Sequence, residues 1–119
     1  MPKDNLIQQK SFDFSLSIIQ LYISLKKERE YVLSKQLLRS GTSIGANIEE
    51  AIAAQSRKDF IHKMSISSKE ARETAYWLKL LQKSDLTNID VSLYLSEIDQ
   101  IIRIITSIIK TSQSSIQNY

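Results

Sequence analysis

The side chains that most often support catalysis or metal binding are scarce in this chain. His62 is the single histidine, and the 119 residues include no cysteine. A dinuclear metal site in a helical bundle takes two Glu-x-x-His pairs, and a hydrolytic triad needs a histidine oriented by a carboxylate. His62 meets neither requirement, and it lies near lysines on the side of its segment opposite the apolar residues. We therefore expect a surface histidine, no catalytic or metal site, and no cofactor.

The stretch "QLLRSGTSIGANIEEA" (residues 36–51) has the glycines and hydroxyls of a phosphate-binding loop. A Walker loop, however, follows a strand and ends in Lys-Ser or Lys-Thr, and neither feature is present. Apolar or small residues recur instead every three or four positions, at Leu33, Leu37, Gly41, Ile44, Ile48 and Ala51. This spacing predicts a helix. Because two glycines inside a helix cost about 2 kcal/mol relative to alanine, we expect another helix to pack closely on Gly41 and Gly45.

Positive charge is concentrated in residues 57–83, which carry seven Lys or Arg against three acids. At about 100° per residue, six of the seven fall within about 120° of the helical wheel. These six, called the basic row below, are Arg57, Lys58, Lys69, Arg72, Lys79 and Lys83. A helix of this length spans about 39 Å, enough to follow a nucleic-acid backbone by phosphate contacts. The alternative is an ordinary solvated face. Lesser candidates for phosphate contacts are Lys26, Lys27, Lys35 and Arg39.

A polar edge runs along the second predicted helix. Arg39, Ser43 and Asn47 follow one another in four-residue steps and continue to Glu50, while Glu70 and Glu73 lie away from the basic row on the next helix. This pattern predicts either a ligand or inter-subunit site, or a salt-bridged helix edge, which is the commoner arrangement.

These residues require a helical scaffold. Four segments with three- and four-residue apolar spacing cover residues 5–26, 31–54, 57–83 and 88–115, separated by charged or polar runs. The pattern predicts an all-α fold, an antiparallel up-and-down four-helix bundle that forms one domain over residues 1–119. No apolar stretch approaches the ~20 residues of a membrane span, and the first residues lack the pattern of a signal peptide. We therefore expect a cytoplasmic protein.

The first segment carries two apolar stripes about 200° apart on the helical wheel. We expect Phe12, Leu16, Ile19 and Ile23 to face the core. The second stripe then needs another partner. The alternatives are a helix buried deeply in its own domain, which is difficult in so small a chain, and a subunit interface, which we favour. The predicted interface residues are Phe14, Ile18, Leu21 and Leu25, joined by Ile66, Trp77 and Leu80 of the third segment.

The segments "QLLRSGTSIGANIEEA" and "SRKDFIHKMSISSKEARETAYWLKLL" resemble the four helix bundle protein family, which is related to the 23S ribosomal RNA intervening-sequence proteins. The resemblance extends from about Phe12 to Ile109. It implies a small antiparallel bundle that assembles into a homopentameric ring and has a nucleic-acid-binding role. Similar proteins include the accessory proteins of diversity-generating retroelements, which partner a reverse transcriptase and RNA.

Together these observations predict a non-catalytic, oligomeric protein that binds structured RNA or DNA through the basic row. The competing interpretation is a homo-oligomeric scaffold or accessory protein that binds another protein without touching nucleic acid. Neither interpretation includes a membrane.

Overall fold

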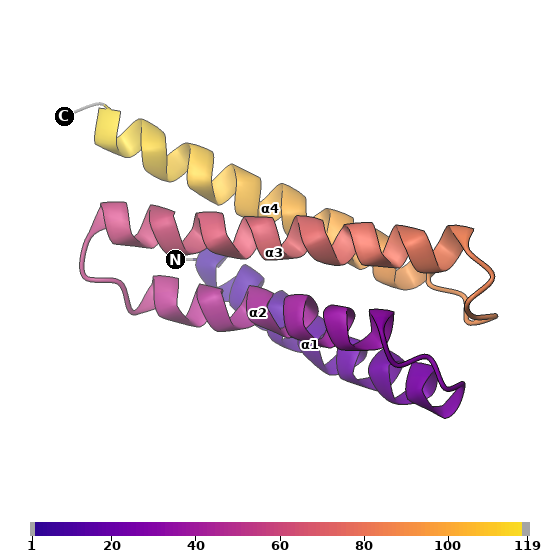
Figure 1. The fold of residues 1–119 in the computed structure, drawn as a ribbon. Helices are drawn as coiled ribbons and strands as arrows, with labels where there is room; N and C mark the ends of the chain where they lie inside the picture. Colours follow the sequence, from indigo (N-terminus) through magenta and orange to yellow (C-terminus); the bar gives the residue numbers. More distant parts are fainter. Residues whose placement is uncertain (1, 118–119) are drawn as a thin grey trace.

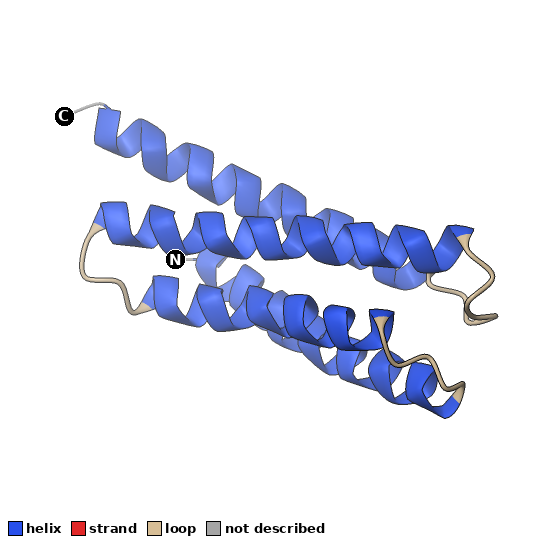
Figure 2. Cartoon of the chain, in the orientation of Figure 1, coloured by secondary structure: helices blue, strands red, loops and turns tan. Residues whose placement is uncertain are grey.

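Four helices make up the described chain. The computed structural model describes residues 2–117, and the side chains of residues 6–115. Helix α1 covers Pro2–Lys27, α2 Leu33–Ile52, α3 Arg57–Lys83 and α4 Ser92–Gln117. They run up and down in a bundle of 53 × 22 × 21 Å, with helices and loops alone in this part of the chain (Figures 1 and 2). The predicted all-α up-and-down four-helix bundle is thus confirmed.

Each helix packs against its neighbours in the chain, and α1 also packs against α4 to close the bundle. The α2–α3 pair is the most intimate, and the α1–α4 seam is the most open. Helices α1 and α3 consequently lie at opposite corners of the bundle. None of the described helices combines the length and the apolar content needed to cross a membrane.

Side chains in the loops determine where the helices start. The carboxylate of Glu30 accepts the backbone N–H groups of Val32, Leu33 and Ser34 at 3.1, 3.0 and 2.7 Å, so α2 begins at Leu33 rather than at 31. The Ser56 hydroxyl accepts the backbone N–H of Asp59 at 3.0 Å and caps α3. Asp90 accepts the backbone N–H of Ser92 at 2.9 Å, and α4 begins there rather than at 88.

The core stripes expected on α2, α3 and α4 are confirmed. On α2 the side chains of Leu37, Ile44 and Ile48 are fully buried, and on α3 those of Met64 and Leu78 are. The remaining buried positions on these three helices include Gly41, Ala51, Ser67, Ala71, Thr74, Leu81, Ile98, Ile101, Ile105 and Ile108, and Val91 is buried directly before α4. Three- and four-residue spacing therefore identifies the inner face of three helices.

The assignment of the two stripes on α1 is wrong: they are exchanged. Phe14, Ile18, Leu21 and Leu25 are at most 1% exposed and form the core, so they cannot be an interface between subunits. Phe12, Leu16 and Ile23 are 59%, 50% and 41% exposed and lie on the outside. The inner stripe continues toward the N-terminus through the buried residues Ile7 and Ser11, whereas the outer stripe is bounded by Gln8 and Gln9. Over the whole helix, the longer stripe is the one that the bundle buries.

The expected interface residues on α3 also need correction. Trp77 packs against the core of its own bundle, and its Nε1 is buried. Ile66 is half-buried, and Leu80 is 37% exposed. Because α1 and α3 occupy opposite corners, and because the α1 stripe in question faces inward, these residues do not form one continuous apolar surface.

Close helix packing at the glycines is asymmetric. A Cβ atom at Gly41 would lie 2.9 Å from both Cγ atoms of Ile18 on α1, closer than real Cβ contacts. At Gly45 the nearest atoms, the carbonyl and hydroxyl oxygens of Ser11, would lie at 3.4 Å. Gly41 is thus required for the approach of α1, and Gly45 has room for a methyl group.

Candidate nucleic-acid interface

The basic row lies on α3, on the outside of the bundle, and is called the α3 basic row from here on. All six of its residues are exposed, whereas Met64, Ala71 and Leu78 of the same helix are buried. The spacing of the apolar residues determines which side of α3 faces the core. The basic residues lie on the opposite side because Lys and Arg keep their charged ends in water. The row therefore runs over the 27 residues of α3 on the side facing away from the core.

The ion pairs among the described side chains do not involve the α3 basic row. None of the six side chains makes an ion pair with a carboxylate within the part of the chain whose side chains are described. The seventh cation of α3, Lys63, differs, because its Nζ lies 3.0 Å from the Glu50 carboxylate on α2. The row is thus a line of uncompensated positive charge, which attracts phosphate groups.

Arg39 is held by acids rather than left free. Its guanidinium donates to Glu70 at 3.1 Å and also pairs with Glu73, both on α3. The hydrogen bond with Glu73 raises the pKa of Arg39, and the negative charges of both carboxylates add to the effect. Of the two interpretations of the polar edge, the structure shows the salt-bridged one. Arg39 is therefore a weak candidate for phosphate contact.

The other lesser candidates gather at one end of the bundle. Lys26 and Lys27 close α1, and Lys35 lies in the first turns of α2, all exposed. The same end holds the C-terminus of α3 with Lys79 and Lys83 (Figure 1). There the Thr87 hydroxyl donates to Glu28 at 2.7 Å and ties the α3–α4 loop to the α1–α2 loop.

A groove between α3 and α4 adds two basic residues that spacing on α3 alone does not reveal. One hollow of about 390 Å³ and one of about 580 Å³ share Arg72 and Ile102 as lining residues. Lys79 lines the first, and Arg103 and Lys110 of α4 line the second. Arg103 and Lys110 are seven residues apart, two helical turns, so the sequence does hold the signal that they share a face. Arg103 also lies 3.0 Å from Asp99 in an exposed pair one turn apart.

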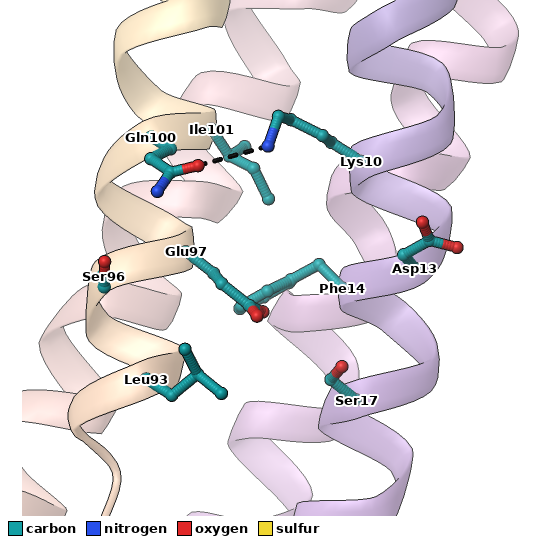
Figure 3. Close-up of a pocket in the computed structure, with 9 residues that line it drawn as sticks. All are labelled: Lys10, Asp13, Phe14, Ser17, Leu93, Ser96, Glu97, Gln100 and Ile101. Carbon is teal, nitrogen blue, oxygen red and sulfur yellow. Dashed lines mark hydrogen bonds between the residues drawn. The ribbon is translucent and has the colours of Figure 1, made fainter.

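The cleft between α1 and α4 has a different character. Lys10 Nζ on α1 donates to the amide oxygen of Gln100 on α4 at 3.1 Å and bridges the open seam (Figure 3). Glu97 extends from α4 toward Phe14 of α1, and Asp13 also lines this cleft of about 320 Å³. Its single cation is thus already bonded and two carboxylates share the hollow, so this cleft does not favour an anionic ligand.

An apolar face covers the outside of α1. It consists of Phe12, Leu16, Ile19 and Ile23, and is called the α1 apolar face. Next to it, Thr42, Gly45 and Ala46 of α2 help to line a shallow hollow of about 350 Å³ that also takes in Phe12, Leu16 and Ile19. The small side chains of α2 leave this apolar surface open to water, which is typical of a contact site for another molecule.

His62 is exposed, as expected. The described residues include no group of three or more His, Cys, Asp or Glu that could hold a metal ion.

Comparisons with known proteins agree with this fold. The family model described as 23S rRNA-intervening sequence protein matches residues 3–107. A crystal structure of a protein with unknown function from the S23 ribosomal protein family of Bacteroides thetaiotaomicron is similar, with a TM-score of 0.83 and 46% sequence identity. The similarity covers 91% of this chain and 98% of that one. No curated protein matches the chain. Since the family model spans most of the sequence and the solved relative is nearly half identical, the chain belongs to the 23S rRNA-intervening sequence protein family.

Proposed function

We propose that this protein is a non-catalytic nucleic-acid-binding protein of the cytoplasm, which binds structured RNA or DNA through the α3 basic row. One observation carries the proposal: six exposed cations follow one helix, and none has a carboxylate partner among the described side chains. Keeping so many like charges together without acids is unfavourable for the isolated protein, and it becomes favourable when phosphates are the partner.

Binding of this kind acts by neutralising phosphates, so it depends on salt and reads base sequence weakly. If all six residues contact phosphates, the logarithm of the binding constant should fall against the logarithm of the salt concentration with a slope of about −4 to −5. Arg39 should contribute little, because Glu70 and Glu73 already occupy its guanidinium.

Self-association is part of the proposal. The α1 apolar face exposes Phe12, Leu16 and Ile23 on the outside of the bundle, and burying them against a second copy of the chain would remove them from water. The family resemblance implies a ring of five. A closed ring repeats the α3 basic row once per subunit and so multiplies the phosphate contacts of each bound nucleic acid.

The experiment is a fluorescence anisotropy titration of a labelled RNA hairpin at low salt with three proteins. The first is the wild type and the second carries Lys69→Glu, Arg72→Glu and Lys79→Glu. The third, a control, carries Lys26→Glu, Lys27→Glu and Lys35→Glu, which changes the net charge by the same amount at residues of α1 and α2 that are not part of the row. We expect the second protein to lose most of its affinity and the control to lose much less.

A protein-docking scaffold is the second candidate, and the α1 apolar face is the observation that favours it. In that case both charge-reversed proteins should bind the partner protein with the affinity of the wild type. Salt should change that affinity little, because the contact is apolar. Absence of RNA and DNA binding by the wild type at low salt would reject the proposed function and leave the scaffold.

A further inference from the structure

An aromatic side chain lies in the middle of the α3 basic row. Tyr76 is 57% exposed, four residues after Arg72 and three before Lys79. Residues with these spacings are neighbours on one helix face. Arg72 and Lys79 therefore flank Tyr76 along α3, about 10 Å apart in axial rise.

Tyr76 also stands at the edge of an open hollow. The 390 Å³ space between α3 and α4 has Ala75, Leu95, Ile98 and Ile102 as apolar lining, with Tyr76 beside them. Arg72 and Lys79 line the same space. A planar group that enters it meets apolar side chains on one side and positive charge at the rim, a combination typical of sites for ligands with a flat apolar part and an anionic part.

The tyrosine ring is oriented before any ligand arrives. It meets the ring of Trp77 edge to face, with centroids 5.4 Å apart and an interplanar angle of 65°. Trp77 in turn packs against the bundle core. Because its neighbour is anchored, the exposed ring of Tyr76 loses little conformational freedom when a ligand stacks on it.

The charges around the groove favour a nucleic acid over a protein side chain as the occupant. Among the residues that line its two hollows, Arg72, Lys79, Arg103 and Lys110 are cationic, and Asp99 is the one carboxylate. Asp99 is already paired with Arg103 at 3.0 Å. An apolar side chain of a protein partner would use the lining of the hollow and leave Arg72, Lys79 and Lys110 without a carboxylate or phosphate partner.

We propose that Tyr76 and the α3–α4 hollow receive an unpaired base, while phosphates on either side of that base contact Arg72 and Lys79. This inference rests on the proposed function and makes it more specific: the preferred ligand is a single-stranded or bulged segment rather than a continuous duplex. Bases inside a duplex are stacked on one another, whereas the unpaired bases of loops and single strands stack on exposed aromatic side chains.

The test compares three labelled probes of one length in anisotropy titrations at low salt: a single-stranded RNA, a single-stranded DNA and a blunt RNA duplex. The proteins are the wild type, Tyr76→Ala, Tyr76→Phe and the control Tyr31→Ala. Tyr31 is a suitable control because its side chain is 51% exposed, close to the 57% of Tyr76. It lies in the loop before α2 rather than on the row. Melting curves check that every variant is folded.

We expect the wild type to bind single strands more tightly than the duplex. Tyr76→Ala should weaken single-strand binding about tenfold or more, the order expected for one lost base–aromatic stack, and should leave duplex binding unchanged. Tyr76→Phe and Tyr31→Ala should behave as wild type. Equal binding of the RNA and DNA strands, or tighter binding of RNA through its 2′-hydroxyls, both support the proposal, since each keeps the stacked base.

A single strand carrying one 2-aminopurine reports stacking directly. Its fluorescence should be quenched by the wild type and by Tyr76→Phe, and much less by Tyr76→Ala. Equal affinity for strand and duplex with no effect of Tyr76→Ala overturns the inference and leaves the α3 basic row as a phosphate-binding surface. Absence of quenching would also overturn the inference, and a protein side chain would then be the better candidate for the occupant of the hollow. Failure of all three probes to bind would reject the proposed function itself.

Discussion

Two glycines on one helix should respond to the same substitution with opposite signs. Gly41→Ala places a methyl group 2.9 Å from Cγ1 and Cγ2 of Ile18. Ile18 is 0% exposed, and because a β-branched side chain in a helix has essentially one χ1 rotamer, it cannot turn away. Overpacking of this kind costs about 1–3 kcal/mol, whereas alanine improves helix propensity by about 1 kcal/mol. We expect a net loss of stability of about 1 kcal/mol, and of about 2 kcal/mol at most.

Gly45→Ala meets a different environment. Its methyl group would lie 3.4 Å from the oxygens of Ser11, at the edge of ordinary van der Waals contact. The gain in helix propensity, about 1 kcal/mol, should therefore dominate. For a domain of this size the melting temperature should rise by about 4 °C for Gly45→Ala, and it should fall by about 4 °C, and at most by about 8 °C, for Gly41→Ala.

The assay is urea unfolding followed by far-ultraviolet circular dichroism at one fixed protein concentration, because self-association would couple stability to concentration. A double-mutant cycle assigns the cause. Ile18→Ala alone should cost about 2–5 kcal/mol, and in that background Gly41→Ala should become neutral or stabilising, since both Cγ atoms are gone. If Gly41→Ala is as harmless as Gly45→Ala, or costs the same with alanine at position 18, the close-packing explanation is wrong.

Three further substitutions test other parts of the structure. Thr74→Val should cost about 1–3 kcal/mol in urea unfolding, because the buried Ser40 hydroxyl loses the Thr74 hydroxyl 2.8 Å away; a cost near zero would contradict this. Hydrogen bonds from the Ser92 hydroxyl and amide lower the pKa of Asp90, so its ionised form stabilises the start of α4 above the ordinary carboxyl range, and this stabilisation is lost as the pH falls through the lowered pKa. Asp90→Ala should therefore melt earlier than wild type at neutral pH, and the two should converge in strong acid; a gap that is independent of pH would refute the assignment. Replacing Phe12 and Leu16, 59% and 50% exposed, by serine should shift sedimentation toward the monomer without loss of helix content, and an unchanged sedimentation coefficient would remove the α1 apolar face from the assembly.

Spacing predicts the inner face of a helix when the helix has one apolar stripe. Leu37, Ile44 and Ile48 on α2 are buried where the three- and four-residue steps place them. On α1 two stripes of similar hydrophobicity compete, and the choice between Phe12 and Phe14 depends on the partner helix. Ile18 faces inward because Gly41 on α2 leaves space for it. Within α1 the only signal is the greater length of the inner stripe, which continues to Ser11 and Ile7.

The candidate interface divides in the same way. The six residues of the α3 basic row lie on one face because their positions along one helix put them there, so the sequence alone predicts them. Whether a cation is free is a different question. Arg39 has the same charge as Arg72, but the packing of α2 on α3 brings Glu70 and Glu73 to Arg39 and leaves Arg72 without a carboxylate partner among the described side chains. The first residue of α2 is not predicted correctly for a related reason. It depends on hydrogen bonds that the Glu30 carboxylate, in the preceding loop, accepts from the backbone of α2, and the apolar spacing does not report them.

The salt dependence of RNA binding tests the central claim most directly. Wild-type affinity for an RNA hairpin should fall as salt rises, with a logarithmic slope of about −4 to −5 for six phosphate contacts. The Lys69→Glu, Arg72→Glu and Lys79→Glu protein should bind far more weakly, and with a slope nearer zero by two units or more. Wild-type binding that salt does not change, or a slope that the three substitutions leave intact, would contradict phosphate recognition by the α3 basic row.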